Sequence, residues 1–145
     1  MHLSLIVIGM LWAGFVNAIN YAGDFRKLET TTGCESIFEN RYQDVTFTQG
    51  DDSRAITKAT MHFSNPDPKN PSILGGADFN GHFVVQSHLL LARSYFNVGK
   101  TAYRAKFDGH ADSKSIAGKI TVTKMDSENR RPLCTASAEF SSSAK

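Results

Sequence analysis

The sequence has little net charge, and its charged residues form no cluster that identifies a partner. Sixteen lysines and arginines stand against fourteen acidic residues, which gives a formal charge of +2 over 145 residues. No segment interleaves basic residues with aromatic ones, as a nucleic-acid-binding stripe would. We therefore expect no nucleic acid among the partners of this chain.

Motifs of catalysis and of cofactor binding are also missing. The sequence contains no GxSxG nucleophile motif and no phosphate-binding loop that ends in GK[ST]. Neither of the two cysteines has a second ligand at the spacing of a zinc site. We therefore expect no cofactor. A small hydrolase, with a His/Asp site assembled from separate strands, stays open as an alternative.

A long apolar run occurs only at the N-terminus. Residues 3–16 carry no charge and lead into the small-residue pattern VNA, which is typical of a signal peptidase site. The run is shorter than the roughly 20 residues of a membrane-spanning helix, and glycines interrupt it. The sequence thus predicts a signal peptide at 1–18 and a secreted protein, extracellular or periplasmic, with no stable membrane span after signal removal.

Export favours a disulfide between the only two cysteines, Cys34 and Cys134. Removing 18 of 145 residues leaves 127, enough for one domain with its own core. We assign a single β domain to 19–140. Residues 141–145, with the sequence SSSAK, are expected to form a polar C-terminal tail.

Helical periodicity is scarce, whereas period-two alternation recurs in four runs. These runs are 54–63, 101–107, 115–125 and 133–140. In each, apolar or small residues occupy every second position, as in antiparallel strands with one buried face. The pattern predicts an all-β fold, either a small antiparallel β-sandwich or a closed β-barrel of about eight strands. Segments 35–45 and 87–98 admit strand or helix.

Turn residues separate the predicted strands. Asn80-Gly81 is typical of a two-residue hairpin, in which both central residues need positive φ. Residues 65–72 hold three of the four prolines, so this segment is expected to be an exposed connection.

The one cluster with metal-ligand chemistry is Asp108, His110 and Asp112. If the segment stayed extended, the alternate spacing would direct two carboxylates and an imidazole to one side, where they could bind a divalent ion. Phe107 ends one predicted run, and Gly109 follows Asp108 as in a turn. We therefore expect a solvated loop and keep the three residues as weak metal candidates.

Aromatic residues bear on carbohydrate recognition, because carbohydrate-binding β domains usually expose Trp or Tyr. The only tryptophan, Trp12, lies in the segment that we expect to be removed. Four tyrosines remain: Tyr21, Tyr42, Tyr95 and Tyr103. The ten phenylalanines are expected to fill the core.

These observations favour a binding or interaction domain that acts at the cell surface or in the extracellular space. Its partner would be an extracellular protein, a glycan or a small apolar ligand. The main alternative is a carrier, because an eight-stranded barrel can enclose one small molecule. A carrier should contain an internal apolar cavity, whereas a binding domain should have a filled interior.

Overall fold

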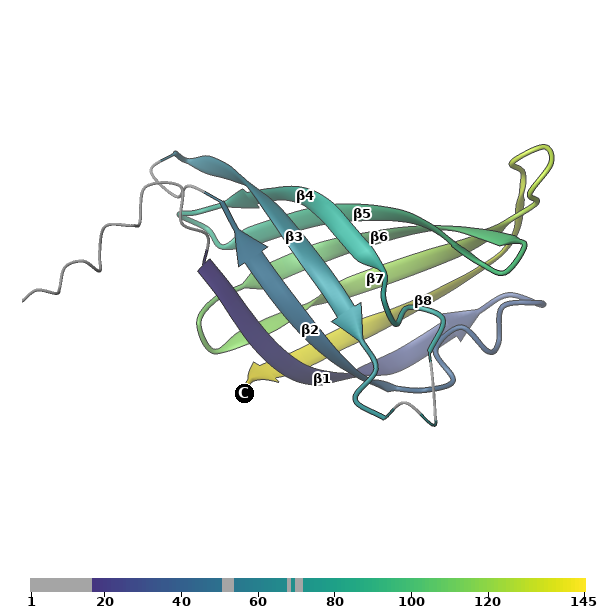
Figure 1. Cartoon of the computed structure of the whole chain (residues 1–145), viewed down its shortest axis with the longest axis horizontal. Coiled ribbons are helices and arrows are strands. Elements are labelled where there is room, and N and C mark those ends of the chain that lie inside the picture. Colours follow the sequence, from purple (N-terminus) through teal and green to yellow (C-terminus); the bar gives the residue numbers. More distant parts are fainter. Residues whose placement is uncertain (1–16, 51–53, 68, 70–71) are drawn as a thin grey trace, which may run out of the picture.

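The computed structural model describes residues 17–50, 54–67, 69 and 72–145, and it consists of eight antiparallel strands (Figure 1). Each strand pairs with its neighbours in the chain, and β1 also pairs with β8, so the sheet closes into a barrel. The strands are β1 (Asn17–Thr30), β2 (Tyr42–Gln49), β3 (Ile56–Ser64), β4 (Asp78–Val84), β5 (Leu89–Val98), β6 (Thr101–Ala111), β7 (Ser115–Met125) and β8 (Pro132–Ala144). The all-β prediction is confirmed, and of its two forms the chain adopts the barrel.

The barrel closes because one face of each strand is apolar and packs against the others. The alternation expected in β3, β6, β7 and β8 is observed as alternating buried and exposed residues. Phenylalanine rings meet near the centre, where Phe140 lies 5.0 Å from Phe25 and 5.5 Å from Phe63 between ring centroids. Closure also removes the unpaired edge strands that a sandwich of this size would expose.

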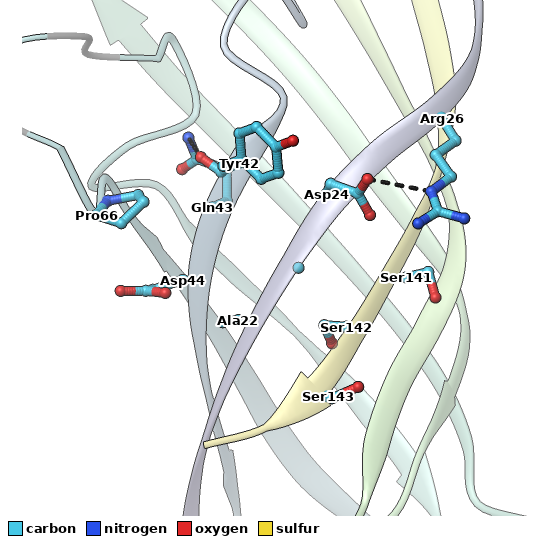
Figure 2. A pocket seen from close by; sticks show the side chains of 11 residues that line it. Ala22, Asp24, Arg26, Tyr42, Gln43, Asp44, Pro66, Ser141, Ser142 and Ser143 are labelled. Carbon is cyan, nitrogen blue, oxygen red and sulfur yellow. Dashed lines mark hydrogen bonds and ion pairs between the residues drawn. The ribbon is translucent and has the colours of Figure 1, made fainter.

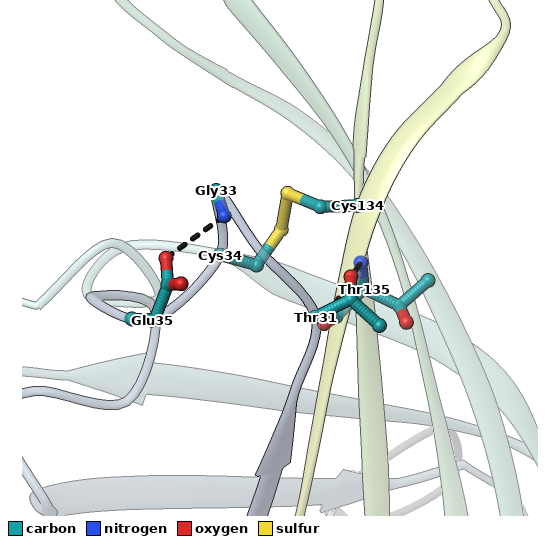
Figure 3. The surroundings of a disulfide bond; sticks show 6 residues. All are labelled: Thr31, Gly33, Cys34, Glu35, Cys134 and Thr135. Atoms are coloured by element: carbon teal, nitrogen blue, oxygen red, sulfur yellow. Dashed lines mark hydrogen bonds between the residues drawn. A yellow bond between two sulfur atoms is a disulfide. The ribbon is translucent and has the colours of Figure 1, made fainter.

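The predicted disulfide joins Cys34, which follows β1, to Cys134 on the inner face of β8 (Figure 3). Their Cα atoms are 5.7 Å apart. Beside the bond, the amide of Thr31 donates to the carbonyl of Thr135 at 2.9 Å, and the amide of Thr135 donates to Oγ1 of Thr31 at 2.9 Å. A covalent link and two hydrogen bonds thus fasten the β1–β2 connection to the last strand. We call this end of the barrel the disulfide end.

Segments 35–45 and 87–98, for which the sequence admits strand or helix, form turns and strands. Segment 35–45 begins with turns, in which the amide of Ile37 donates to the carbonyl of Cys34 at 3.2 Å, and ends in β2. Ile37 and Phe38 are buried and cover the disulfide end, and Phe38 lies 4.8 Å from Phe25 between ring centroids. Segment 87–98 is a turn followed by β5, as the strand interpretation expects.

Two other expectations need correction. Residues 141–145 are not a tail, because β8 continues through Ala144 and pairs with both β1 and β7. The side chain of Ser142 is buried, and its hydroxyl donates to the carbonyl of Ile116 at 2.8 Å. Asn80-Gly81 is not a hairpin turn either, since both residues lie inside β4. Pairing between the strands of the barrel thus outweighs the polar composition of 141–145 and the turn preference of Asn80-Gly81.

Residues 1–16 of the predicted signal peptide lie outside the described residues. The predicted cleavage after Ala18 falls within β1, where Asn17 and Ala18 pair with Gln49 and Thr48. Among the described residues we find no apolar helix with the length needed to cross a bilayer. The disulfide is compatible with an oxidising location such as the extracellular space.

Candidate functional site

The interior of the barrel is occupied by side chains. Within the described residues, the largest fully buried side chains are Tyr21, Phe25, Phe38, Phe63, Phe79, Phe107, Phe140, Met61, Leu74, Leu90, Ile116 and Ile120. This is the filled interior expected of a binding domain. We therefore expect a ligand site on the outer surface or at the barrel end where β1 begins.

Of the three metal candidates, only Asp112 lies in a loop as expected. Strand β6 continues to Ala111, and both Asp108 and His110 are exposed on its outer face. Asp112 begins the β6–β7 turn, where its Oδ1 accepts the amides of Lys114 at 2.8 Å and Ser115 at 2.9 Å. These two hydrogen bonds lower the pKa of Asp112. The described part of the chain contains no group of three acidic, His or Cys side chains suited to a metal ion.

Strand β6 continues through Gly109 to Ala111, and this glycine faces inward. A Cβ on Gly109 would lie 2.6 Å from the Cα of Gly118, its partner on β7. Gly109 therefore permits a close approach of two strands and does not form a turn.

One histidine–carboxylate pair was not predicted from the sequence. Nδ1 of His62 on β3 lies 2.6 Å from Oδ1 of Asp78 on β4. The two residues are cross-strand partners, and their side chains are 45% and 59% exposed. An imidazole so open to water lacks the enclosed setting in which a catalytic base is tuned. We find no support here for the hydrolase alternative.

A hollow of about 770 Å³ lies at the end of the barrel where β1 begins. Ile19, Phe47, Phe83 and Val85 give it an apolar lining, and His88 and Lys114 are among its polar residues. Tyr21 is fully buried, and its hydroxyl donates to the carbonyl of Asp112 at 2.5 Å. This hydrogen bond ties β1 to the β6–β7 turn.

We expect Tyr21 to make folding stability fall at high pH. Burial, and then the charge of Asp112, raise the pKa of Tyr21 from 10.0 to about 12. The folded phenol keeps its proton to higher pH than the unfolded one, so its contribution is complete below pH 10 and is lost as the pH rises towards 12. Urea denaturation across this range should show a smaller loss of stability in Tyr21→Phe.

Burial also raises the pKa of Tyr103. The loss of stability at high pH should therefore be smaller in Tyr21→Phe than in the wild type but should not disappear. Tyr95→Phe, at a side chain that is 70% exposed, is the control and should follow the wild-type profile. A Tyr21→Phe profile identical to the wild-type one would contradict the assignment.

A polar hollow of about 560 Å³ crosses the outside of β1 and is called the β1 groove below (Figure 2). Its floor is shallow because Ala22 and Gly23 have almost no side chain. A Cβ on Gly23 would lie 2.5 Å from the Cβ of Ser142 and 2.8 Å from the ring of Phe140, so β1 passes close to β8 at this point. The rest of the lining comes from β1, β2, β8 and one loop: Asp24, Arg26, Tyr42, Gln43, Asp44, Pro66, Ser141, Ser142 and Ser143.

Ion pairs balance the charges around the β1 groove. Asp24 pairs with Arg26 at 3.1 Å, and Asp44 pairs at 2.9 Å with Lys145, which does not itself line the groove. Gln43 is buried, and its Nε2 donates to the carbonyl of Tyr42 at 2.8 Å, whereas its buried Oε1 has no hydrogen-bond partner among the described residues. The groove is therefore polar but locally neutral.

Tyr42 forms the wall of the groove. It is 66% exposed, and together with Pro66 it lines both the β1 groove and an adjoining hollow of about 700 Å³. Arg41 and Lys69 line this second hollow. An aromatic ring thus stands between two polar depressions.

Comparison of the chain with protein-family models, with curated proteins and with solved structures found no match. We therefore argue the function from the side chains of the hollows described above.

Proposed function

We propose that this protein is an exported binding domain that binds an uncharged saccharide in the β1 groove. The observation that carries the proposal is the position of Tyr42, a mostly exposed ring between two polar hollows. The C–H face of a sugar ring packs well on an aromatic face, and the hydroxyls at its edge need hydrogen-bond partners. The groove offers both kinds of contact.

The polar residues around Tyr42 suit hydroxyl groups better than ions. Asp24 and Asp44 keep acceptor oxygens for sugar hydroxyls while their charges are balanced by Arg26 and Lys145. The hydroxyls of Ser141 and Ser143, as Figure 2 shows, lie on the opposite side of β1 from Tyr42. Since this balance leaves no net charge, an uncharged saccharide is favoured over an acidic one.

A second function has one observation in its favour. The apolar hollow where β1 begins could take a small apolar ligand, as the carrier alternative requires. Because side chains fill the interior, such a site would be shallow and not enclosed. Thermal stabilisation by fatty acids, with no response to any saccharide, would favour this carrier over the proposed domain.

The test begins with a screen of neutral oligosaccharides against the exported protein, followed by titration calorimetry of any that bind. Tyr42→Ala should weaken binding by about tenfold to thirtyfold, because it removes the stacking surface. Tyr42→Phe keeps the ring and should change affinity by less than about threefold.

Ile56→Ala is the control, since this large apolar side chain is 54% exposed but lies on β3 and lines none of the hollows described here. It should bind like the wild type. If no neutral saccharide binds, or if Tyr42→Ala binds as well as the wild type, the proposed function is wrong.

A further inference from the structure

Basic side chains gather on the side of the barrel opposite β1. Strand β5 is the fourth strand from β1 in both directions around the closed sheet. On the outer face of β5 and β6, Arg93, Arg104 and Lys106 line a hollow of about 390 Å³ with Tyr95, and β7 adds Thr121 and Thr123. We call this the basic hollow. It shares no residue with the β1 groove.

The strand register brings these cations together. Arg93 lies directly opposite Lys106, and Arg104 lies opposite Tyr95. Directly opposed residues have Cβ atoms about 5 Å apart, and like charges in such positions destabilise a sheet. Arg93, Arg104 and Lys106 are all exposed, so these charges lie together at the surface of the barrel.

The positive charges of the basic hollow form no ion pairs. Within the described residues, the ion pairs involve other side chains, and none includes Arg93, Arg104 or Lys106. Asp108 on β6 lines an adjoining hollow together with Arg93 and Lys106, but it forms no ion pair with either of them. Three cations and one neighbouring acid leave an excess of positive charge, which an anionic ligand would balance.

The other residues of the basic hollow narrow the chemistry of that ligand. Guanidinium groups bind sulfate, phosphate or carboxylate oxygens through two parallel hydrogen bonds, and lysine adds a point charge. Thr121 and Thr123 contribute hydroxyls at the base, where Thr123 is buried. Tyr95 is 70% exposed and offers a flat face to a ring. An anionic group attached to a sugar ring matches both features.

We infer that the basic hollow binds a sulfated saccharide. Its small volume fits a short segment of such a chain, whereas a duplex nucleic acid would need a wider basic stripe than a chain of net charge +2 presents. The inference does not depend on the β1 groove, because the two sites share no residue and differ in charge: the β1 groove is locally neutral, whereas the basic hollow is positive.

Titration calorimetry of the exported protein with a heparin-derived hexasaccharide tests this inference. Binding should weaken as salt rises from about 50 to about 200 mM, with a slope of log K against log salt of about −2 to −3 for three neutralised cations. Arg104→Gln should weaken binding by about tenfold, and Arg93→Gln with Lys106→Gln by more than about tenfold.

Lys58→Gln is the charge-matched control, because Lys58 is an exposed lysine on β3 and lies outside the basic hollow. It should bind like the wild type. The variants of the basic hollow are also expected to melt no lower than the wild type at low salt, since they remove a repulsion between neighbours. A role in stability alone would instead lower the melting temperature.

Three results would overturn the inference. They are absence of hexasaccharide binding, wild-type affinity in the Arg93→Gln, Arg104→Gln, Lys106→Gln triple variant, and equal or tighter binding of duplex DNA or anionic lipid vesicles. Tyr42→Ala should leave hexasaccharide binding unchanged, and Arg104→Gln should leave neutral-saccharide binding unchanged. Failure of one site is therefore distinguishable from failure of the other.

Discussion

Replacing both cysteines, Cys34→Ser with Cys134→Ser, is expected to lower the free energy of unfolding by about 2–5 kcal/mol. The bond closes a loop with a sequence separation of 100 residues. For a loop of this length the restriction of the unfolded chain contributes about 4.7 kcal/mol. A small domain has only about 5–15 kcal/mol of stability in total. The variant should therefore be close to unfolding at physiological temperature.

The disulfide also holds a cover on the barrel. Cys34 precedes Ile37 and Phe38, which are buried at the disulfide end, and the ring of Phe38 packs against Phe25. Once the bond is lost, this connection keeps the hydrogen bonds between Thr31 and Thr135 but no covalent link to β8. Fraying of the cover would then expose part of the core, which adds to the loss of stability.

Urea denaturation of the double variant and of the wild type, with and without reductant, measures the effect. Reduced wild type and double variant should unfold at similar urea concentrations, well below the oxidised wild type. If the double variant lay within about 0.5 kcal/mol of the oxidised wild type, the disulfide would contribute little and the assignment of its role would be wrong.

The inner faces of the strands could be predicted from the sequence because alternation is a local property. Phe63 on β3, Phe107 on β6 and Phe140 on β8 each lie in a run whose alternate residues are buried. The disulfide followed from the number of cysteines and from the expected export. Closure of the barrel could not be predicted, because it depends on the pairing of β1 with β8, which are far apart in the sequence.

The binding hollows depend on register between strands and were therefore not visible in the sequence. Tyr42 was one of four tyrosines with no feature to distinguish it, and its position between two hollows depends on Pro66 from a distant loop. Likewise, Arg93 and Lys106 seemed scattered until pairing placed them opposite each other. The turn predictions at Asn80-Gly81 and Asp108-Gly109 were wrong for a related reason. Gly81 and Gly109 allow neighbouring strands to approach each other closely.

Gly81→Ala tests this account of the glycines directly. A Cβ on Gly81 would overlap the carbonyl oxygen of Leu91 and would lie 2.6 Å from the Cα of Ala92, both in the backbone of β5. Backbone cannot rotate away as a side chain does, so β4 and β5 must separate. On its other side β4 is held to β3, since the Oδ1 of Asn80 accepts the hydroxyl of Thr60 at 3.1 Å. We expect a loss of about 3 kcal/mol or more in urea denaturation.

Gly50→Ala provides the matched control. Among the described residues, a Cβ on Gly50 would meet only the carbonyl oxygen of Lys58, at 3.4 Å, and Gly50 is not among the glycines of positive φ. Alanine there restricts the unfolded chain without a clash, so stability should stay the same or rise by up to about 1 kcal/mol. The same substitution should thus have opposite signs at the two positions. Equal effects at Gly81 and Gly50 would mean that conformational freedom, and not the close approach of β4 and β5, explains glycine within the barrel wall.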